Sequence, residues 1–212
     1  MSSRFRILFV CSDNICRSPL AEILTRRGLI DRLGPGAASF TVASAGTIAV
    51  PGTLIDIRTR HLLGQYQLEN AVSAFRATAL ERGVVADADL VLTAEQSHRA
   101  VAIEMYPQAL GKTFCLLEFT HLLAPPIAAP LPVNLVQRAR TAVLVARRRR
   151  GTGPFSLSGA HDIPEPTGRP APMYRQTIDV VGRAVEDLVD LLAGTRVTRS
   201  RESLVVGRQT GR

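Results

Sequence analysis

The chain has 212 residues, of which 46% are hydrophobic and 21% charged, a composition typical of one globular domain with a sizeable core. The formal net charge is +8 at pH 7, and Lys112 is the only lysine, so arginine carries nearly all of the positive charge. A basic chain can meet nucleic acid, an anionic membrane or a phosphorylated substrate, and the charge alone does not choose among them. No stretch approaches the roughly 20 apolar residues of a membrane-spanning helix, which excludes a membrane span.

The three cysteines, Cys11, Cys16 and Cys115, are too few and odd in number for a disulfide scaffold. They lack the C-x-x-C spacing of a metal-ligand pair, and we expect no metal site. The segment before Cys11 has too few apolar residues for a secretory signal. These features favour a reducing, cytoplasmic location.

The first predicted elements surround a short polar loop. An apolar run predicts a buried strand at Arg6–Val10, and the spacing of apolar residues predicts a helix at Pro19–Arg32. Ser18 is expected to be the N-cap of that helix, with Pro19 at its first position. A second strand is predicted at Phe40–Ala43.

Strands and helices continue to alternate along the next part of the chain. Helices are predicted at Asp56–Gln65, Ala71–Arg82 and Glu95–Met105, and strands at Ala88–Thr93 and Lys112–Phe119. This alternation predicts an α/β fold of three layers, in which a four-stranded parallel sheet is flanked by helices.

The pattern loosens after the fourth predicted strand. A Pro/Ala-rich stretch opens an insertion at about 122–160, which contains a helix predicted at Asn134–Ala146. A long last helix is predicted at Met173–Leu192. We therefore expect one domain over residues 1–194 and a disordered basic tail over 195–212.

The insertion also carries four consecutive arginines, Arg147–Arg150. Such a run is either a solvated surface or a docking surface for an acidic or phosphorylated protein, and the sequence leaves both interpretations open. We expect no specific nucleic-acid partner and no membrane partner, and the sequence does not indicate the oligomeric state.

Cys11 stands at the end of the first predicted strand, and the loop after it leads directly into a helix. Ligands of parallel sheets bind beyond the carboxyl ends of the strands, and loop amides together with a helix N-terminus form a socket for an oxyanion. Arg17 can hold two oxygens of a phosphate in its fork. The same positive field should lower the pKa of the Cys11 thiol, and Ser18 can donate a hydrogen bond to the thiolate. The arrangement predicts a phosphate-binding loop with a nucleophile at its base.

The stretch VCSDNICRSPLAE resembles the N-terminal signature of the low-molecular-weight protein tyrosine phosphatases, C-x5-R-[ST]. Cys11, Arg17 and Ser18 match the signature, and the residues from Asn14 to Pro19 match in order. The resemblance continues in the sequences SAGT, ADLVLT and KTFCLLEF. It covers about residues 4–121 and returns at 161–192.

The resemblance implies a two-step phosphatase without a metal or cofactor. Cys11 would attack phosphorus and form a cysteinyl-phosphate, Arg17 would stabilise the transition state, and Ser18 would lower the pKa of the thiol. Asn14 and Ser44 would hold the loop in its unusual conformation, because Asn tolerates left-handed backbone angles. The implied partner is a protein carrying phosphotyrosine, such as a tyrosine kinase or one of its substrates. The implied substrate-binding residues of the loop are Ser12, Asp13, Asn14, Ile15, Cys16 and Ser18.

Three positions depart from the pattern of that family. Glu165 stands where the family has an aspartate as general acid, and Asp162 is the alternative acid. Thr167 replaces an aromatic residue that flanks the substrate ring, which leaves the preference for phosphotyrosine open. Asp13 replaces a small residue, and we expect its carboxylate to face solvent because the loop amides must face the anion.

Two other functions are compatible with such a loop. A thiol-dependent arsenate reductase would need cysteines that relay a disulfide from Cys11. Cys16 is either a small buried residue or such a redox partner, but Cys115 is expected in the core of a strand. A non-catalytic protein could bind a phosphorylated partner, although binding alone does not require the thiol. His98 is expected on a surface or a helix face, without a role in the site.

Overall fold

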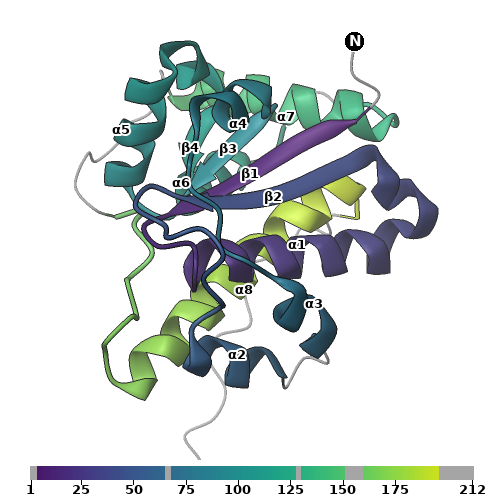
Figure 1. Cartoon of the computed structure of the whole chain (residues 1–212). Helices are drawn as coiled ribbons and strands as arrows, with labels where there is room; N and C mark the ends of the chain where they lie inside the picture. The colour runs from purple at the N-terminus through teal and green to yellow at the C-terminus, as the bar shows by residue number, and fades with distance from the viewer. Residues whose placement is uncertain (1–3, 65–67, 128–129, 151–159, 196–212) are drawn as a thin grey trace, which may run out of the picture.

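A parallel sheet forms the centre of the computed structural model, which describes residues 4–64, 68–127, 130–150 and 160–195 (Figure 1). The strands lie in the order β2-β1-β3-β4, and every pair of neighbours is parallel. Their bounds are β1 Phe5–Cys11, β2 Phe40–Gly46, β3 Leu90–Thr93 and β4 Thr113–Cys115. The predicted four-stranded parallel sheet is confirmed.

The side chains of β1 point alternately into two hydrophobic clusters, one on each face of the sheet. Phe5, Ile7 and Phe9 belong to a large cluster on one face, whereas Leu8 and Val10 belong to a smaller cluster on the other. Successive side chains of a strand point to opposite faces, so a wholly apolar strand is expected where helices cover both faces. The three-layer architecture follows from this burial.

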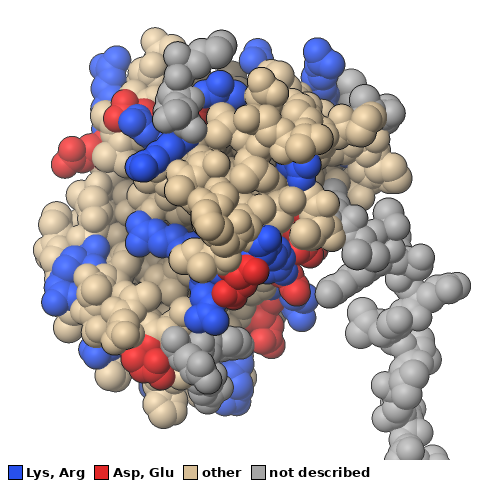
Figure 2. All heavy atoms as spheres, turned by 90° about the vertical axis from the view of Figure 1, so that its right-hand side faces the viewer, with Lys and Arg blue, Asp and Glu red and all other residues tan. Residues whose placement is uncertain are grey.

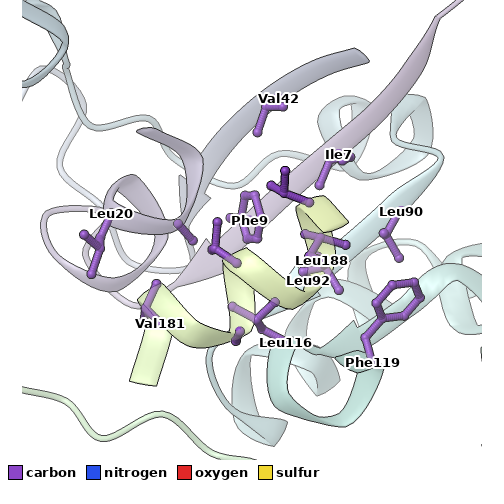
Figure 3. Packing of buried hydrophobic residues seen from close by; sticks show 14 of the residues in the cluster. Ile7, Phe9, Leu20, Val42, Leu90, Leu92, Leu116, Phe119, Val181 and Leu188 are labelled. Carbon is purple, nitrogen blue, oxygen red and sulfur yellow. The ribbon is translucent and has the colours of Figure 1, made fainter. Parts of the chain in front are cut away.

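Helices cover the large cluster on one face and the small cluster on the other (Figure 1). The first group contains α1 (Arg17–Leu33), α6 (Leu116–Leu123), α7 (Leu135–Arg150) and α8 (Ala171–Ala193). Figure 3 shows side chains of α8 beside those of β1 and β2 in this cluster. The second group contains α4 (Arg82–Asp87), α5 (Gln96–Met105) and the 3-10 helix η2 (Pro107–Lys112). A further 3-10 helix, η1 (Gly34–Ser39), follows α1.

The helix predicted at Ala71–Arg82 is wrong over its central part. Two short helices, α2 (Ile57–Gly64) and α3 (Glu69–Ala74), are followed by extended chain that reaches α4. That extended chain pairs with the end of β2, because Thr78 accepts from the amide of Gly46 at 2.9 Å and Leu80 donates to the Gly46 carbonyl at 2.8 Å. These tertiary hydrogen bonds outweigh the helical pattern of the sequence.

The strand predicted at Lys112–Phe119 is also too long. The strand β4 ends at Cys115, and the remaining residues begin α6. The carboxylate of Glu118 accepts from the backbone amide of Cys115 at 3.1 Å, which is one half of a capping box. A glutamate at the third helical position, followed by more apolar residues, was the signal for a helix start inside an apolar run.

Helix α1 begins at Arg17, one residue before the predicted N-cap. Cys16 occupies the N-cap position, and no side chain caps the helix. Ser18 therefore lies within the first turn, where its hydroxyl is available to the loop, and Pro19 is tolerated there because first-turn amides have no helical partner. The prediction of Ser18 as a helix cap is wrong.

The arginine run ends α7, and its last two members have structural partners. Arg149 donates to the carbonyls of Leu122, Pro125 and Pro126 at 2.8, 3.0 and 2.6 Å, at the end of α6. The Leu122 carbonyl lies in the last turn of α6 and the other two follow it, where backbone acceptors need donors. The guanidinium of Arg149 therefore has a structural role, which neither of the two interpretations of the arginine run included.

Arg150 lies deeper than its neighbours Arg147 and Arg148, which are exposed. Its guanidinium forms a bidentate pair with Glu118, at 2.7 and 2.9 Å, and donates to the carbonyl of Thr113 at 2.9 Å. It also stacks over the ring of Phe114, 3.8 Å from the ring centroid. The insertion is thus fastened to β4 and α6 by this arginine.

The remaining charge is dispersed. Figure 2 shows basic side chains in several separate groups over the face it presents, with acidic side chains between them. Among the described residues, no helix is long and apolar enough to cross a membrane. The predicted tail lies outside the described residues except for residue 195, and the predicted domain limits stay a prediction.

Candidate active site

The loop after β1 is braced from outside by the segment after β2. The amides of Thr47 and Ile48 donate to the carbonyls of Cys11 and Ser12 at 2.9 and 3.0 Å. A side chain on Gly46 would collide with the Ser12 carbonyl and would approach the amide nitrogen of Asn14 to 2.8 Å. The glycine of the sequence SAGT is therefore required by the close approach of two backbones.

Asn14 organises the interior of the loop. It is fully buried, and its φ of 54° is the left-handed conformation that the sequence analysis expected. Its amide nitrogen donates to the hydroxyls of Ser18 and Ser44, each at 2.8 Å, and its amide oxygen accepts from the backbone of Thr78 at 2.8 Å. Ser44 in turn donates to the buried carboxylate of Glu22 at 2.5 Å. The predicted contacts of Asn14 with Ser44 are present, and Glu22 extends the network.

The Cys11 sulfur lies at the base of this loop, with 2% of the residue exposed. It is 3.0 Å from the hydroxyl of Ser18, and the backbone of Ser18 and of Asn14 also helps to lower the pKa of the thiol. Burial nevertheless raises the pKa of Cys11, outweighing these hydrogen bonds and the charge of Arg17, all of which lower it. The expectation of a lowered pKa is thus not met in this structure.

Arg17 offsets the effect of burial only in part, because two carboxylates balance its charge. The side chain is 1% exposed and forms ion pairs with Glu95 and Glu165. The same guanidinium donates to the carbonyl of Ile163 at 2.9 Å and to the hydroxyl of Ser12 at 3.1 Å. Two carboxylates beside one guanidinium leave little net positive field for the thiol.

The two candidate acids occupy different positions. Glu165 contacts Arg17, and its other oxygen accepts from the backbone amide and the hydroxyl of Thr167 at 3.1 and 2.8 Å. Asp162 accepts from the backbone amide of Gln96 at 2.9 Å, at the start of α5. Asp162 is thus engaged in holding a helix end, whereas Glu165 lies among the groups around Cys11.

Two residues near the loop were not expected there. Glu95 pairs with Arg17, and although burial raises its pKa, hydrogen bonding and the charge of Arg17 hold the net pKa below the ordinary value. His98 is 5% exposed, and its Nε2 is 2.9 Å from the hydroxyl oxygen of Ser12. It lies on a helix, as expected, but at the site. Their position just beyond β3 was the available signal, since the carboxyl ends of parallel strands meet at one edge.

The other loop residues differ in exposure. Cys16 is buried, accepts from the hydroxyl of Thr59 at 3.0 Å, and has a pKa raised by burial to about 12. Cys16, Cys11 and Cys115 are all free thiols. Ser12, Asp13 and Ile15 are partly exposed, and the orientation of Asp13 toward solvent stays a prediction. Within the described residues, no group of three or more His, Cys, Asp or Glu side chains could hold a metal ion.

Comparison with known proteins agrees with this geometry. Residues 6–127 match the model of the family described as low molecular weight phosphotyrosine protein phosphatase. A protein-arginine-phosphatase of Geobacillus stearothermophilus is 31% identical over 147 residues, which cover 68% of this chain and 93% of the relative. The low molecular weight protein-tyrosine-phosphatase PtpB of Staphylococcus epidermidis is 35% identical over 116 residues, covering 54% and 73%.

A solved structure gives the same result. The YwlE arginine phosphatase from Geobacillus stearothermophilus superimposes with a TM-score of 0.63 and 26% identity, covering 90% of this chain and 94% of the other. The chain therefore belongs to the low molecular weight phosphotyrosine protein phosphatase family.

Proposed function

We propose that this protein hydrolyses phosphotyrosine in proteins, and aryl phosphate monoesters generally, through a cysteinyl-phosphate intermediate. The observation that carries the proposal is the setting of the Cys11 sulfur, which lies 3.0 Å from the Ser18 hydroxyl and is influenced by the backbone of Asn14 and Ser18 and by the charge of Arg17. A tetrahedral oxyanion bound by the loop and by Arg17 would place its central atom above the sulfur.

The first step transfers the phosphoryl group to the enzyme. The Cys11 sulfur attacks phosphorus, the S–P bond forms, and the P–O bond to the phenol breaks. Glu165 gives its proton to the leaving oxygen. The protonated side chain of Glu165 carries no charge and therefore forms no ion pair with Arg17. The form of Glu165 that can donate a proton is thus also the form that leaves Arg17 free to bind the substrate. Once released, Arg17 binds the phosphoryl oxygens, and its charge favours the thiolate form of Cys11.

The second step regenerates the thiolate of Cys11 and the protonated form of Glu165. Glu165, now a carboxylate, takes a proton from a water molecule that attacks the phosphocysteine. The S–P bond breaks, the sulfur departs as a thiolate stabilised by Ser18, and inorganic phosphate is formed. Asn14 and Ser44 keep their proposed role of holding the loop, which their buried hydrogen bonds support.

Hydrolysis of para-nitrophenyl phosphate and of a phosphotyrosine peptide tests the proposal. The wild type should release phosphate from both, and Cys11→Ser should release it from neither, because an alcohol in this loop is a far weaker nucleophile than a thiolate. Rapid acid quenching should trap phosphate on Cys11, detected by mass spectrometry. A wild type that binds phosphate but turns over neither substrate would favour the non-catalytic alternative.

A second candidate substrate is phosphoarginine in proteins. The relative matched over 93% of its length is named a protein-arginine-phosphatase. Thr167, which replaces the aromatic residue of the family pattern, is exposed and donates to Glu165 rather than forming an apolar wall. Matched peptides that carry phosphotyrosine or phosphoarginine at the same position decide the preference through the ratio of their kcat/KM values.

Arsenate reduction has less support from the thiols. Cys16 and Cys115 are both buried, and burial raises their pKa values to about 12 and about 11, which disfavours disulfide relay. Thiol-coupled reduction of arsenate by the wild type would overturn this ranking.

We also retain the proposals of a cytoplasmic location and of a phosphotyrosine-bearing protein, such as a kinase or its substrate, as partner. The three free cysteines are consistent with a reducing compartment.

A further inference from the structure

The imidazole of His98 has no task in the steps above, yet it is buried against the loop. It is the third residue of α5, and its Nε2 lies 2.9 Å from the hydroxyl oxygen of Ser12. Its other nitrogen, Nδ1, is buried and has no hydrogen-bond partner among the described residues. A buried ring nitrogen without a hydrogen-bond partner lowers the stability of the fold, so the position of His98 beside the loop calls for an explanation.

The direction of the bond between Ser12 and His98 depends on the tautomer of His98, and the contact of Ser12 with Arg17 favours one arrangement. Arg17 donates from Nη2 to the Ser12 oxygen at 3.1 Å, so that oxygen is already an acceptor. The hydroxyl hydrogen of Ser12 is then available for Nε2 of His98, which must be unprotonated to accept it. The chain of donors runs from Arg17 through Ser12 to His98.

We propose that His98 is a positioning residue for the phosphatase reaction, whose neutral ring orients the Ser12 hydroxyl so that Ser12 holds the Nη2 edge of Arg17 in place for the phosphoryl group. Glu95 fixes the other edge of the guanidinium through Nη1. When Glu165 leaves Arg17 to act as an acid, Ser12 is the partner that remains on Nη2. With Glu95 on Nη1 and Ser12 on Nη2, the guanidinium keeps its orientation while a phosphoryl group replaces the carboxylate of Glu165.

The surroundings of His98 favour the neutral ring. Burial and the charge of Arg17 lower the pKa of His98, against the charges of Glu95, Glu165 and Asp162, which raise it. A doubly protonated ring would place a second cation beside Arg17, and its Nε2 could no longer accept the hydrogen of Ser12. The neutral form is therefore the one that completes the network at neutral pH.

A double-mutant cycle tests whether His98 acts through Ser12. The variants are His98→Leu, Ser12→Ala and the double variant, with His61→Leu as matched control because His61 is exposed on α2. We expect His98→Leu to raise the dissociation constant of inorganic phosphate and to lower kcat/KM for para-nitrophenyl phosphate by about tenfold. In the Ser12→Ala background the same change should cost less than about twofold. His61→Leu should change neither quantity.

A conservative variant and a spectroscopic signature separate positioning from a structural role. His98→Gln should recover most of the loss, since its amide oxygen can accept from Ser12. Two-bond 1H–15N spectra of the wild type should show His98 as the neutral tautomer protonated on Nδ1 at pH 7, and Ser12→Ala should abolish that preference. These spectra need only wild type and Ser12→Ala, so they decide the question even where His98→Leu does not fold.

Three results would overturn the proposal: additive effects in the cycle, a His98→Leu variant equal to wild type, or a His98 ring that is charged or protonated on Nε2 at pH 7. The inference rests on the proposed function only for its turnover measurement. If wild type hydrolyses no phosphate ester while the phosphate-binding cycle and the spectra behave as expected, the proposed function fails and the positioning role of His98 stands.

Discussion

Arg17 is buried and Arg150 is half-buried, and both pair with carboxylates, but the exposure of those carboxylates differs. Arg150 forms a bidentate pair with Glu118, whose side chain is only 9% exposed, and its guanidinium is covered by the ring of Phe114. Arg17 pairs with Glu95 and Glu165, whose side chains are 28% and 35% exposed. The partners of Arg17 thus lie where another anion can replace them, whereas the partner of Arg150 does not.

The comparison shows how one residue type serves binding or structure. A guanidinium with partly exposed partners on a loop is an exchange site, since a dianionic phosphoryl group can take the place of one carboxylate. The guanidinium of Arg150, held by Glu118 and the ring of Phe114, has a structural role, because it determines where α7 packs against α6 and β4. Burial of the arginine alone does not distinguish the two cases; the exposure of its partners does.

The largest effect is expected from Arg17→Lys. The change keeps the positive charge and removes the planar fork that holds two oxygens. We expect kcat/KM for para-nitrophenyl phosphate to fall about 10²–10³-fold, with a far smaller change in the midpoint of urea unfolding. If the Arg17→Lys variant were instead less stable but as active as wild type, Arg17 would have a structural role like that of Arg150.

Glu165→Gln should have the next largest effect on turnover. Loss of the proton donor should lower kcat for aryl phosphates about 10²-fold, most strongly for esters with poor leaving groups. Asp162→Asn is the matched control, because it removes a carboxylate of the same loop that holds the start of α5. Equal losses in the two variants would remove the assignment of Glu165 as the acid.

The same Glu165→Gln variant should bind anions better than wild type. With one carboxylate gone, Arg17 has more net charge to offer inorganic phosphate and to lower the pKa of Cys11. Thiolate forms as pH rises through that pKa, so the pH profile of Cys11 alkylation by iodoacetate should move to lower pH. Protection by phosphate should occur at lower phosphate concentration. A profile that moves to higher pH would contradict the proposed exchange at Arg17.

Arg150→Met should have the smallest effect on catalysis and a clear effect on stability. Removing the cation leaves Glu118 buried without its partner, and we expect the free energy of unfolding to fall by about 3 kcal/mol. The kcat/KM value should stay within about twofold of wild type. Urea unfolding and para-nitrophenyl phosphate assays check both parts, and Arg150→Met/Glu118→Gln should recover part of the lost stability.

The sequence predicted the parts of the molecule whose signals are local. The strand before Cys11, the spacing to Arg17 and the left-handed Asn14 are all contained in one short segment. Glu95 and His98 were missed because their partners lie some 80 positions away along the chain, and only the order of the strands brings them together. The role of Arg150 was missed for the same reason, since its partners are on β4 and α6.

The predicted pKa of Cys11 failed for a different reason. A rule based on the loop alone counts the helix N-terminus and Arg17 as positive, but it omits the burial of the sulfur, which raises the pKa, and the carboxylates that pair with Arg17. Glu165 lies 148 positions beyond Arg17, in a segment whose Pro164 carbonyl accepts from the hydroxyl of Thr177 on α8 at 3.1 Å. Electrostatic predictions from a motif therefore need the complete set of neighbouring charges, which the fold alone provides.

The contact of Glu165 with Arg17 has a consequence for the end of each catalytic cycle. A carboxylate tethered beside the guanidinium is present at a high effective concentration, on the order of millimolar or above. Once Glu165 has lost the proton that it took from water, newly formed inorganic phosphate must compete with this resident anion, whereas a substrate gains further contacts from the protein that carries it. We expect the enzyme to release its product readily and to be only weakly inhibited by it.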